Sequence, residues 1–304
     1  MTTCDLLITG AGGFVGRHLV EHAACADLSV HTTDWDLRDA AVTAERMAEI
    51  GPRAVAHLAA TPRVGSSWTW LAGDLRMAGS VLAAVAEHAP AAPVLFAGSA
   101  AQYGLGLPRP LSEDDPTEPV SAYGAAKCVL ERAVTAAPLR GAVRVIWTRS
   151  FNHVGPGQGT DAPVSEWARQ VAEAEQHGGG RLRTGALDVV RDFLDVRDVA
   201  AAYLALLRSD AAGVVNVASG SATALRAIVD LLLEQARVTV TPVLDPALRR
   251  SIDPPHVVGD PTRLRLLTGV TPQISLARSV GELLEEWRTR LSASDPPVMS
   301  GATP

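Results

Sequence analysis

Short apolar runs alternate with alanine-rich helical patterns along the first half of this chain, and this alternation narrows its possible folds more than any other feature. The apolar runs are LLITG (6–10), LSVHTT (28–33), AVAHLAA (54–60), PVLFAGSA (93–100) and VRVIWTRS (143–150). They recur at intervals of roughly 30 residues, which is the length of a strand–helix–strand unit. Because such units build parallel sheets with helices on both faces, we predict an α/β fold with a doubly wound parallel sheet.

The first apolar run ends in a glycine-rich turn with the sequence ITGAGGFVGRHLV, and helical character follows directly. Gly10, Gly13 and Gly16 permit a tight turn and a close approach of the backbone to a pyrophosphate, while the N-terminus of the following helix carries partial positive charge. A glycine cluster alone can be only a turn, but at the first strand–helix junction of an alternating chain it predicts a dinucleotide-binding site.

Acidic residues follow the second apolar run in the sequence DWDLRD. A carboxylate at about 20 residues from the glycine turn accepts hydrogen bonds from the ribose hydroxyls of NAD, and its charge repels the 2′-phosphate of NADP. Asp34 stands near this offset, with Asp36 and Asp39 beside it. We therefore favour NADH over NADPH, and a solvated turn of aspartates is the alternative.

The sequence changes character after the fifth apolar run. A Gly/Pro-rich stretch, VGPGQGTDAP, leads into the amphipathic VSEWARQVAEAEQ, after which DFLDVRDVAAAYLALL and GVVNVASG restore strand and helix patterns. We predict a dinucleotide-binding domain over 1–150, to which 188–218 returns. A smaller, discontinuous substrate-binding domain is expected over 151–187 and 219–291, and residues 292–304 are expected to form a flexible tail.

Composition and charge exclude several classes of protein. Hydrophobic residues make up 47% and charged residues 20% of the 304 residues, as in ordinary globular proteins and unlike disordered or fibrous ones. The net charge of −6 argues against the basic face that nucleic acids require. The three cysteines show no paired spacing and the eight histidines no metal-ligand clustering. We expect a cytoplasmic protein without a metal, a leader peptide or a membrane span.

The chain contains a single lysine, Lys127, among 27 Lys and Arg residues. Tyr123 lies four residues earlier, so a helix places the phenol and the ammonium on one face, one turn apart. Ser99 follows the fourth apolar run, at the sheet edge where ligands of open α/β folds bind. The ammonium stabilises the phenolate form of the tyrosine, which makes proton exchange with a ligand feasible. We predict that Ser99, Tyr123 and Lys127 are catalytic.

These three residues resemble the Ser/Thr and Tyr-x-x-x-Lys set of the short-chain dehydrogenase/reductase superfamily. The glycine spacing, and the YG that follows Ser99, are similar to its extended, nucleotide-sugar branch. Within that branch, RSFNHVGPGQG (149–159) and RDFLDVRDVAAAYLALL (191–207) resemble segments of the GDP-4-keto-6-deoxy-D-mannose reductases and related NDP-4-keto-6-deoxyhexose 4-ketoreductases. The resemblance extends from about residue 5 to about residue 290.

The resemblance implies a Rossmann-type fold, NADH or NADPH as cofactor, a nucleotide-diphospho-4-keto-6-deoxy sugar (GDP or dTDP) as substrate, and a homodimer. It implies that the cofactor contacts Gly10, Gly13, Phe14, Val15, Gly16, Asp34, Asp36, Leu37, Leu58, Ala59, Ala60, Tyr123, Lys127 and Phe151. It implies that the substrate contacts Ser99, Tyr123, Asn152, Arg191, Arg249 and Asp260. For Arg191 a bidentate contact to a phosphate is expected, and a surface ion pair is the alternative.

Two positions separate the candidate reactions. Dehydratases of this branch carry acidic residues directly after the catalytic Ser/Thr, and this chain has Ala100 and Ala101 there. Dehydration is therefore disfavoured, whereas reduction of a C4 ketone needs only a hydride, a proton from Tyr123 and a hydroxyl to polarise the carbonyl. An NDP-sugar 4-epimerase with tightly bound NAD is the alternative, and a non-catalytic NAD(P)-sensing regulator is a further one.

One residue departs from the family pattern. Asp74 stands where members usually have an asparagine that opens a helix. Support of the active site by that asparagine is therefore not expected here, and Asp74 is also an ordinary N-cap residue.

Overall fold

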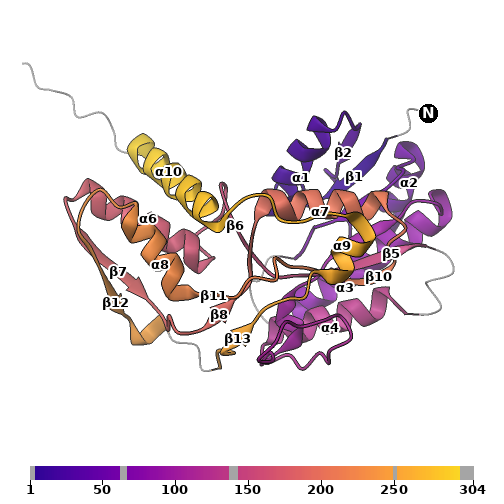
Figure 1. The fold of residues 1–304 in the computed structure, drawn as a ribbon. Helices are drawn as coiled ribbons and strands as arrows, with labels where there is room; N and C mark the ends of the chain where they lie inside the picture. The colour runs from indigo at the N-terminus through magenta and orange to yellow at the C-terminus, as the bar shows by residue number, and fades with distance from the viewer. Residues whose placement is uncertain (1–3, 62–66, 137–142, 249–251, 295–304) are drawn as a thin grey trace, which may run out of the picture. The chain divides into compact units, whose positions relative to one another are not determined.

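The computed structural model describes residues 4–61, 67–136, 143–248 and 252–294 (Figure 1). Contacts within the chain divide it into two compact units. Unit 1 comprises Met1–His153, Val189–Thr223 and Ile252–Ile274, and unit 2 comprises Val154–Asp188, Ala224–Ser251 and Ser275–Pro304.

A six-stranded parallel sheet forms the centre of unit 1. Its strands are β1 (Leu6–Thr9), β2 (Val30–Thr32), β3 (Val55–His57), β4 (Val94–Ala97), β5 (Val145–Ser150) and β10 (Gly213–Val217). They lie in the order β10-β5-β4-β3-β1-β2, and each neighbouring pair is parallel. After β2 the chain crosses to the other side of β1, so the strand order reverses between β1 and β3. In open α/β sheets the carboxyl ends of two such strands border the ligand crevice.

Helices cover both faces of this sheet, whose inner strands β1, β3, β4 and β5 are buried on both sides. On one face lie α1 (Phe14–Cys25) and α7 (Val196–Arg208), and on the other lie α2 (Ala40–Ile50), α3 (Ser67–His88) and α4 (Ala122–Val134). Alternate residues of β1 point to opposite faces, so that Leu6 and Ile8 join the first core and Leu7 joins the second. The predicted α/β class with a doubly wound parallel sheet is confirmed.

Short elements complete unit 1. They are η1 (Ala100–Tyr103), β6 (Asn152–Val154), β8 (Val190–Arg191), β9 (Phe193–Asp195), β11 (Thr223–Ala224), β13 (His256–Val257) and α9 (Thr262–Thr268), with β6 and β11 at the unit junctions. Residues 252–274 group with unit 1, although the sequence analysis assigned them to the second domain. The buried carboxylate of Asp192 explains this, because it accepts hydrogen bonds from the backbone N–H of Gly259 at 3.2 Å and of Gly220 at 2.9 Å, and so joins β13 to the end of β10.

The described part of unit 2 contains three α-helices, one short 3-10 helix and a two-stranded parallel sheet. Its elements are α6 (Pro163–Gln176), β7 (Gly180–Thr184), α8 (Leu225–Glu234), β12 (Val240–Leu244), η2 (Pro246–Leu248) and α10 (Leu276–Ser294). Trp287 of α10 donates its indole N–H to Ser165 Oγ of α6 at 2.9 Å. The predicted tail from residue 292 therefore begins too early, since α10 continues to Ser294, and residues 295–304 lie outside the described residues. None of the described helices is both long enough and apolar enough to cross a membrane.

The glycine turn gives the first testable prediction. A Cβ at Gly16 would lie 2.3 Å from the Gly10 carbonyl oxygen and 2.8 Å from Ala11 Cα, whereas a Cβ at exposed Gly12 would meet nothing within 4 Å. We expect Gly16→Ala to lower the free energy of unfolding by about 1–3 kcal/mol through overpacking. Gly12→Ala is the matched control and should change it by less than about 0.5 kcal/mol. Urea unfolding measures both, and equal values for the two variants would contradict the close approach.

Candidate active site

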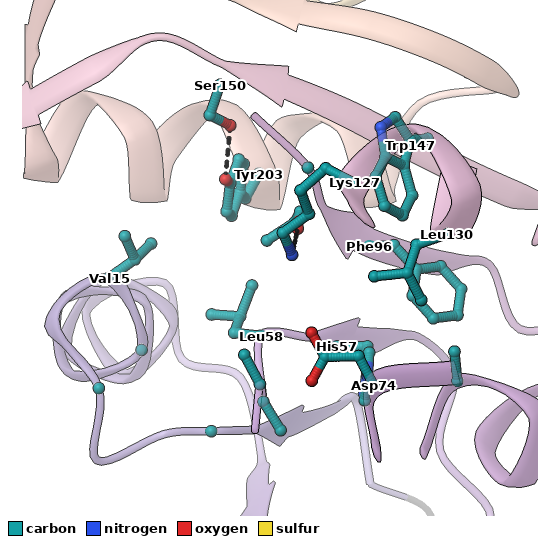
Figure 2. Close-up of a pocket in the computed structure, with 18 of the residues that line it drawn as sticks. Val15, His57, Leu58, Asp74, Phe96, Lys127, Leu130, Trp147, Ser150 and Tyr203 are labelled. Carbon is teal, nitrogen blue, oxygen red and sulfur yellow. Dashed lines mark hydrogen bonds between the residues drawn. The ribbon is translucent and has the colours of Figure 1, made fainter. Parts of the chain in front are cut away.

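A cavity of about 250 Å³ opens at the carboxyl ends of β1, β3 and β4, beside the N-terminus of α1 (Figure 2). All of its lining residues belong to unit 1. They include ten of the predicted site residues: Gly10, Gly13, Phe14, Val15, Gly16, Leu58, Ala59, Ala60, Tyr123 and Lys127. The strand-order reversal and the cavity thus coincide, as expected for a doubly wound sheet.

The glycine turn leaves backbone donors directed at this cavity. Gly10 has a φ of +70°, and a Cβ there would lie 2.6 Å from Ala59 N, so the position requires glycine. Gly13 is the N-cap of α1, and no side chain in the described part of the chain caps this helix end. The first-turn amides of α1 therefore face the cavity with the positive end of the helix dipole. This cradle fits the pyrophosphate of a dinucleotide.

Tyr123 and Lys127 both come from α4 and both line the cavity. Lys127 Nζ lies 5.9 Å from the centre of the Tyr123 ring and 5.9 Å from that of Trp147. It also donates a hydrogen bond to the carbonyl oxygen of Ala97 at 3.0 Å, at the end of β4. Since an ammonium has three donors, this bond fixes its position and leaves two N–H groups for a ligand.

Ser99 follows the cavity-lining Gly98 and is the N-cap of η1. Its Oγ accepts the backbone N–H of Ala101 at 3.2 Å. Ser99 does not line the cavity itself, but its hydroxyl hydrogen stays available because the capping contact uses only a lone pair.

His57, at the end of β3, was not predicted as a site residue. Its side chain is buried and lines the cavity, with Nδ1 2.9 Å from Thr9 Oγ1 and the ring edge-to-face with Phe96 at 5.1 Å. Burial, together with the Lys127 charge, lowers the pKa of His57 from 6.5 to about 3. His57 is therefore a neutral part of the wall, close to the lysine.

Asp74 lies inside α3 and not at its start, so the predicted N-cap role is wrong. The residue is buried, and one carboxylate oxygen accepts the backbone N–H of Thr61 at 2.6 Å, which holds the chain after β3 against α3. Figure 2 shows the carboxylate directed into the cavity from the wall that also carries Leu58 and His57. Asp74 thus places a carboxyl group in the lining of the cavity.

A pair of hydroxyl groups forms another part of the wall. Ser150 Oγ, at the end of β5, lies 2.7 Å from Tyr203 Oη of α7 (Figure 2), and Thr148 Oγ1 donates to Tyr203 Oη at 3.4 Å. Tyr203 is buried, and burial raises the pKa of its phenol. It therefore remains a neutral donor at physiological pH.

The other predicted cofactor residues lie outside the cavity lining. Asp34 is exposed in the turn after β2, and Asp36 forms a bidentate ion pair with Arg38, at 2.8 Å for the shortest contact. The side-chain hydrogen bond from Arg38 is the main reason why the pKa of Asp36 falls to about 2. Leu37 is buried in the core of unit 1. Phe151 is buried in its other core, where it stacks on Tyr103 with ring centres 6.1 Å apart.

The predicted substrate residues beyond the catalytic set are held by other groups. Asn152 donates its amide to the Asp192 carbonyl oxygen at 3.0 Å, and the largely buried Arg191 forms an ion pair with Asp253 at 2.5 Å. Asp260 accepts the backbone N–H of Thr262, the first residue of α9, at 2.9 Å. Arg249 lies outside the described residues. Within the described ranges, no group of three or more His, Cys, Asp or Glu side chains could hold a metal ion.

The cavity also contains residues that the sequence analysis missed. They are His57, Ala78, Phe96, Ala97, Gly98, Leu130, Trp147, Ser150, His153 and Tyr203. Some of these residues could have been predicted from their place in the sequence. His57 directly precedes the predicted Leu58, and Leu130 follows Lys127 by three residues on α4. Tyr203 could not have been predicted in this way, since its place in the cavity lining depends on how α7 packs against the sheet.

Known proteins resemble the chain over most of its length. Residues 6–218 match the family model described as the NAD dependent epimerase/dehydratase family. The chain is 32% identical over 305 residues to GDP-6-deoxy-D-mannose reductase of Pseudomonas aeruginosa, covering 95% of this chain and 99% of that protein. It is 26% identical over 313 residues to UDP-glucose 4-epimerase of Corynebacterium glutamicum, covering 91% and 93% respectively.

A solved structure shows the same fold. The RMD of Pseudomonas aeruginosa, complexed with NADPH, superposes with a TM-score of 0.84 at 32% identity, covering 95% of this chain and 98% of that one. Together these comparisons confirm the resemblance to the extended, nucleotide-sugar branch of the short-chain dehydrogenases/reductases.

The burial of His57 predicts acid sensitivity. Because the folded pKa of about 3 lies below the ordinary 6.5, acidification protonates the unfolded chain first. The free energy of unfolding should lose about 1 kcal/mol per pH unit from this residue as the pH falls below about 6. His57→Asn should flatten this slope, whereas the same change at exposed His31 should leave it unaltered. Urea unfolding at pH 7, 6 and 5 tests this, and parallel slopes for wild type and His57→Asn would refute it.

Proposed function

Because the chain belongs to the NAD dependent epimerase/dehydratase family, we propose that it is an NAD(P)H-dependent 4-ketoreductase. Its substrate is a nucleotide-diphospho-4-keto-6-deoxyhexose, and its product is the corresponding 6-deoxyhexose. The observation that carries this proposal is the Tyr123–Lys127 pair of α4, with the Lys127 ammonium 5.9 Å from the tyrosine ring, in the cavity that the glycine turn borders. The similarity to GDP-6-deoxy-D-mannose reductase supports the choice of substrate.

Three side chains act on the substrate carbonyl. Ser99 donates its hydroxyl hydrogen to the carbonyl oxygen and polarises it, while Tyr123 donates the proton that completes the alcohol. Lys127, anchored on the Ala97 carbonyl oxygen, stabilises the phenolate that Tyr123 leaves behind. When bound, NAD(P)H supplies the hydride.

The glycine turn and the walls of the cavity would hold the cofactor. The first-turn amides of α1 would bind its pyrophosphate. The two N–H groups of Lys127 that do not bond Ala97 would donate hydrogen bonds to its ribose hydroxyls. Asp34 and Asp36 favour NADH through the ribose of the adenosine. The ion pair between Asp36 and Arg38 weakens this preference, because it neutralises one of the two charges. The NADPH complex of the Pseudomonas aeruginosa protein is consistent with use of either cofactor.

Asn152, Arg191, Arg249 and Asp260 are proposed to contact the nucleotide diphosphate. For Arg191 this requires that a substrate phosphate either replaces Asp253 as the ion-pair partner or binds Arg191 together with it.

We also propose a homodimer in the cytoplasm, with GDP or dTDP as the nucleotide. Val129, which is 45% exposed on α4, offers an apolar contact for a second copy.

An NDP-sugar 4-epimerase is the second candidate, because UDP-glucose 4-epimerases match nearly the full chain. An epimerase returns the hydride to its own product and keeps its cofactor. Dehydration is disfavoured by Ala100 and Ala101, which offer no acid or base after Ser99.

The proposed reaction is tested with GDP- and dTDP-4-keto-6-deoxyhexoses and both reduced cofactors. We expect one equivalent of cofactor to be oxidised per 6-deoxyhexose formed, as measured at 340 nm and by product NMR. Tyr123→Phe should lower kcat by about 10²- to 10⁴-fold, because the proton donor is lost, with cofactor affinity retained. Conversion of UDP-glucose to UDP-galactose without net cofactor oxidation would establish the epimerase instead.

The single lysine predicts an unusual intolerance of arginine. Lys127→Arg keeps the charge but replaces a rotating ammonium by a planar fork that the single Ala97 carbonyl cannot match. We expect kcat/KM to fall by about 10²-fold or more. Arg132→Lys, at an exposed position of the same helix, is the control and should leave the rate unchanged. Wild-type activity in Lys127→Arg would show that charge alone suffices.

A further inference from the structure

We propose that Gln102 is a positioning residue for the reaction: its side-chain amide fixes the Ser99 turn relative to the helix that carries Tyr123 and Lys127. The inference rests on the proposed function for its catalytic consequence. It rests on the buried contacts of Gln102 for its structural content.

Both the oxygen and the nitrogen of the Gln102 amide are hydrogen-bonded, and their partners lie in the η1 turn, α4 and β5. Oε1 accepts the backbone N–H of Ser99 at 3.3 Å and the indole N–H of Trp147 at 3.0 Å. Nε2 donates to Glu131 Oε2 at 2.7 Å, with a longer contact of 3.9 Å to Cys128 Sγ. Two donors meet the oxygen and a carboxylate meets the nitrogen, so chemistry dictates the orientation of the amide.

These partners come from three places around the cavity. Ser99 begins η1, Glu131 lies one turn after Lys127 on α4, and Trp147 lies on β5. The Gln102 side chain has no exposed surface. One amide therefore sets the separation between the hydroxyl that polarises the substrate and the helix that supplies the proton.

Glu131, which accepts the Gln102 amide, is itself held in place by an ion pair. Arg149 of β5 holds Glu131 through two hydrogen bonds, Nε to Oε2 at 2.9 Å and Nη2 to Oε1 at 2.7 Å, and both side chains are buried. The guanidinium also lies 4.8 Å from the Tyr103 ring centre and donates to the Glu113 carbonyl oxygen at 3.1 Å. A buried ion pair with two hydrogen bonds gives Glu131 a single position, from which it orients Gln102.

The network also reaches the wall of the cavity. Trp147 lines the cavity and its ring lies 5.9 Å from Lys127 Nζ, while its N–H points to Gln102. A Cβ at Gly98 would lie 2.4 Å from Trp147 Nε1, so the indole packs directly under the strand end that leads to Ser99. Loss of the Gln102 amide would release the indole and the serine turn together.

A purely structural role and a positioning role give different results. Gln102→Met removes the amide at similar length. Ser165→Ala is the matched control, because Ser165 is also fully buried and accepts a tryptophan N–H, that of Trp287, within unit 2. We expect Gln102→Met to lower kcat by about 10- to 100-fold, with cofactor Kd and substrate KM within about threefold of wild type. Ser165→Ala should lower Tm comparably and leave kcat unchanged.

An exchange of the two partners provides the rescue. In the double variant Gln102→Glu with Glu131→Gln, the new carboxylate accepts from Ser99, Trp147 and the new amide N–H, and the new amide oxygen keeps the hydrogen bond from Arg149 Nη2, while Arg149 Nε loses its acceptor on residue 131. We therefore expect partial recovery, with kcat at least about fivefold above that of Gln102→Glu alone, which is impaired by the second carboxylate. Unchanged kcat in Gln102→Met, or no recovery in the double variant, would overturn the proposal. If Gln102→Met does not fold, Gln102→Glu and the double variant decide.

Hydrogen exchange separates this inference from the proposed function. Peptides that contain residues 99–103 should exchange faster in Gln102→Met than in Ser165→Ala and recover in the double variant, whether or not a 4-keto sugar is a substrate. If the wild type reduces none of these sugars, the proposed function fails. The hydrogen-exchange rates of residues 99–103 then test the positioning role of Gln102 by themselves. Unaltered exchange in Gln102→Met would then overturn the role of Gln102.

Discussion

The close approach of three backbone segments around Gly10 is the constraint on which the rest of the site depends. Cβ atoms at Gly10 and Gly16 would lie 2.6 Å from Ala59 N and 2.3 Å from Gly10 O. The ends of β1 and β3 can therefore meet the first turn of α1 only where side chains are absent. The strand order reverses between β1 and β3, where this contact lies. The same close packing around Gly10 therefore both borders the cavity and exposes the first-turn amides of α1, which are suited to an anion.

Electrostatics inside the cavity follow from that packing. In its described lining, Lys127 is the one lysine or arginine, and the neighbouring His57 stays neutral because of burial and the lysine charge. Asp74 contributes the opposite charge. The lining thus offers an anionic ligand the first-turn amides of α1 and the single ammonium of Lys127. The Lys127 ammonium thus lies near the Tyr123 ring, where the proposed reaction would leave a phenolate.

The sequence predicted those parts of the molecule that depend on local pattern. Strand periodicity, the glycine turn and the four-residue spacing of Tyr123 and Lys127 are local, so the fold class and one helix of the site could be derived before the structure. Contacts between distant segments could not. Nothing near Arg191 indicates that Asp253, far along the chain, is its partner, and nothing near Phe151 indicates that its ring packs on Tyr103. Position in a strand places a side chain near a site, but packing of other segments decides whether it reaches the cavity.

Lys127 on α4 and Arg149 on the neighbouring β5 occupy different environments, which shows why one position carries a lysine and the other an arginine. Arg149 meets the carboxylate of Glu131 with two parallel hydrogen bonds, which a planar fork makes and a rotating ammonium does not. Lys127 meets one carbonyl oxygen and two aromatic rings and keeps donors for a ligand. Glu131 lies one turn after Lys127, so the same helix presents both environments. Arg149 thus holds Glu131 in place, whereas in the proposed reaction Lys127 needs donors whose direction can change.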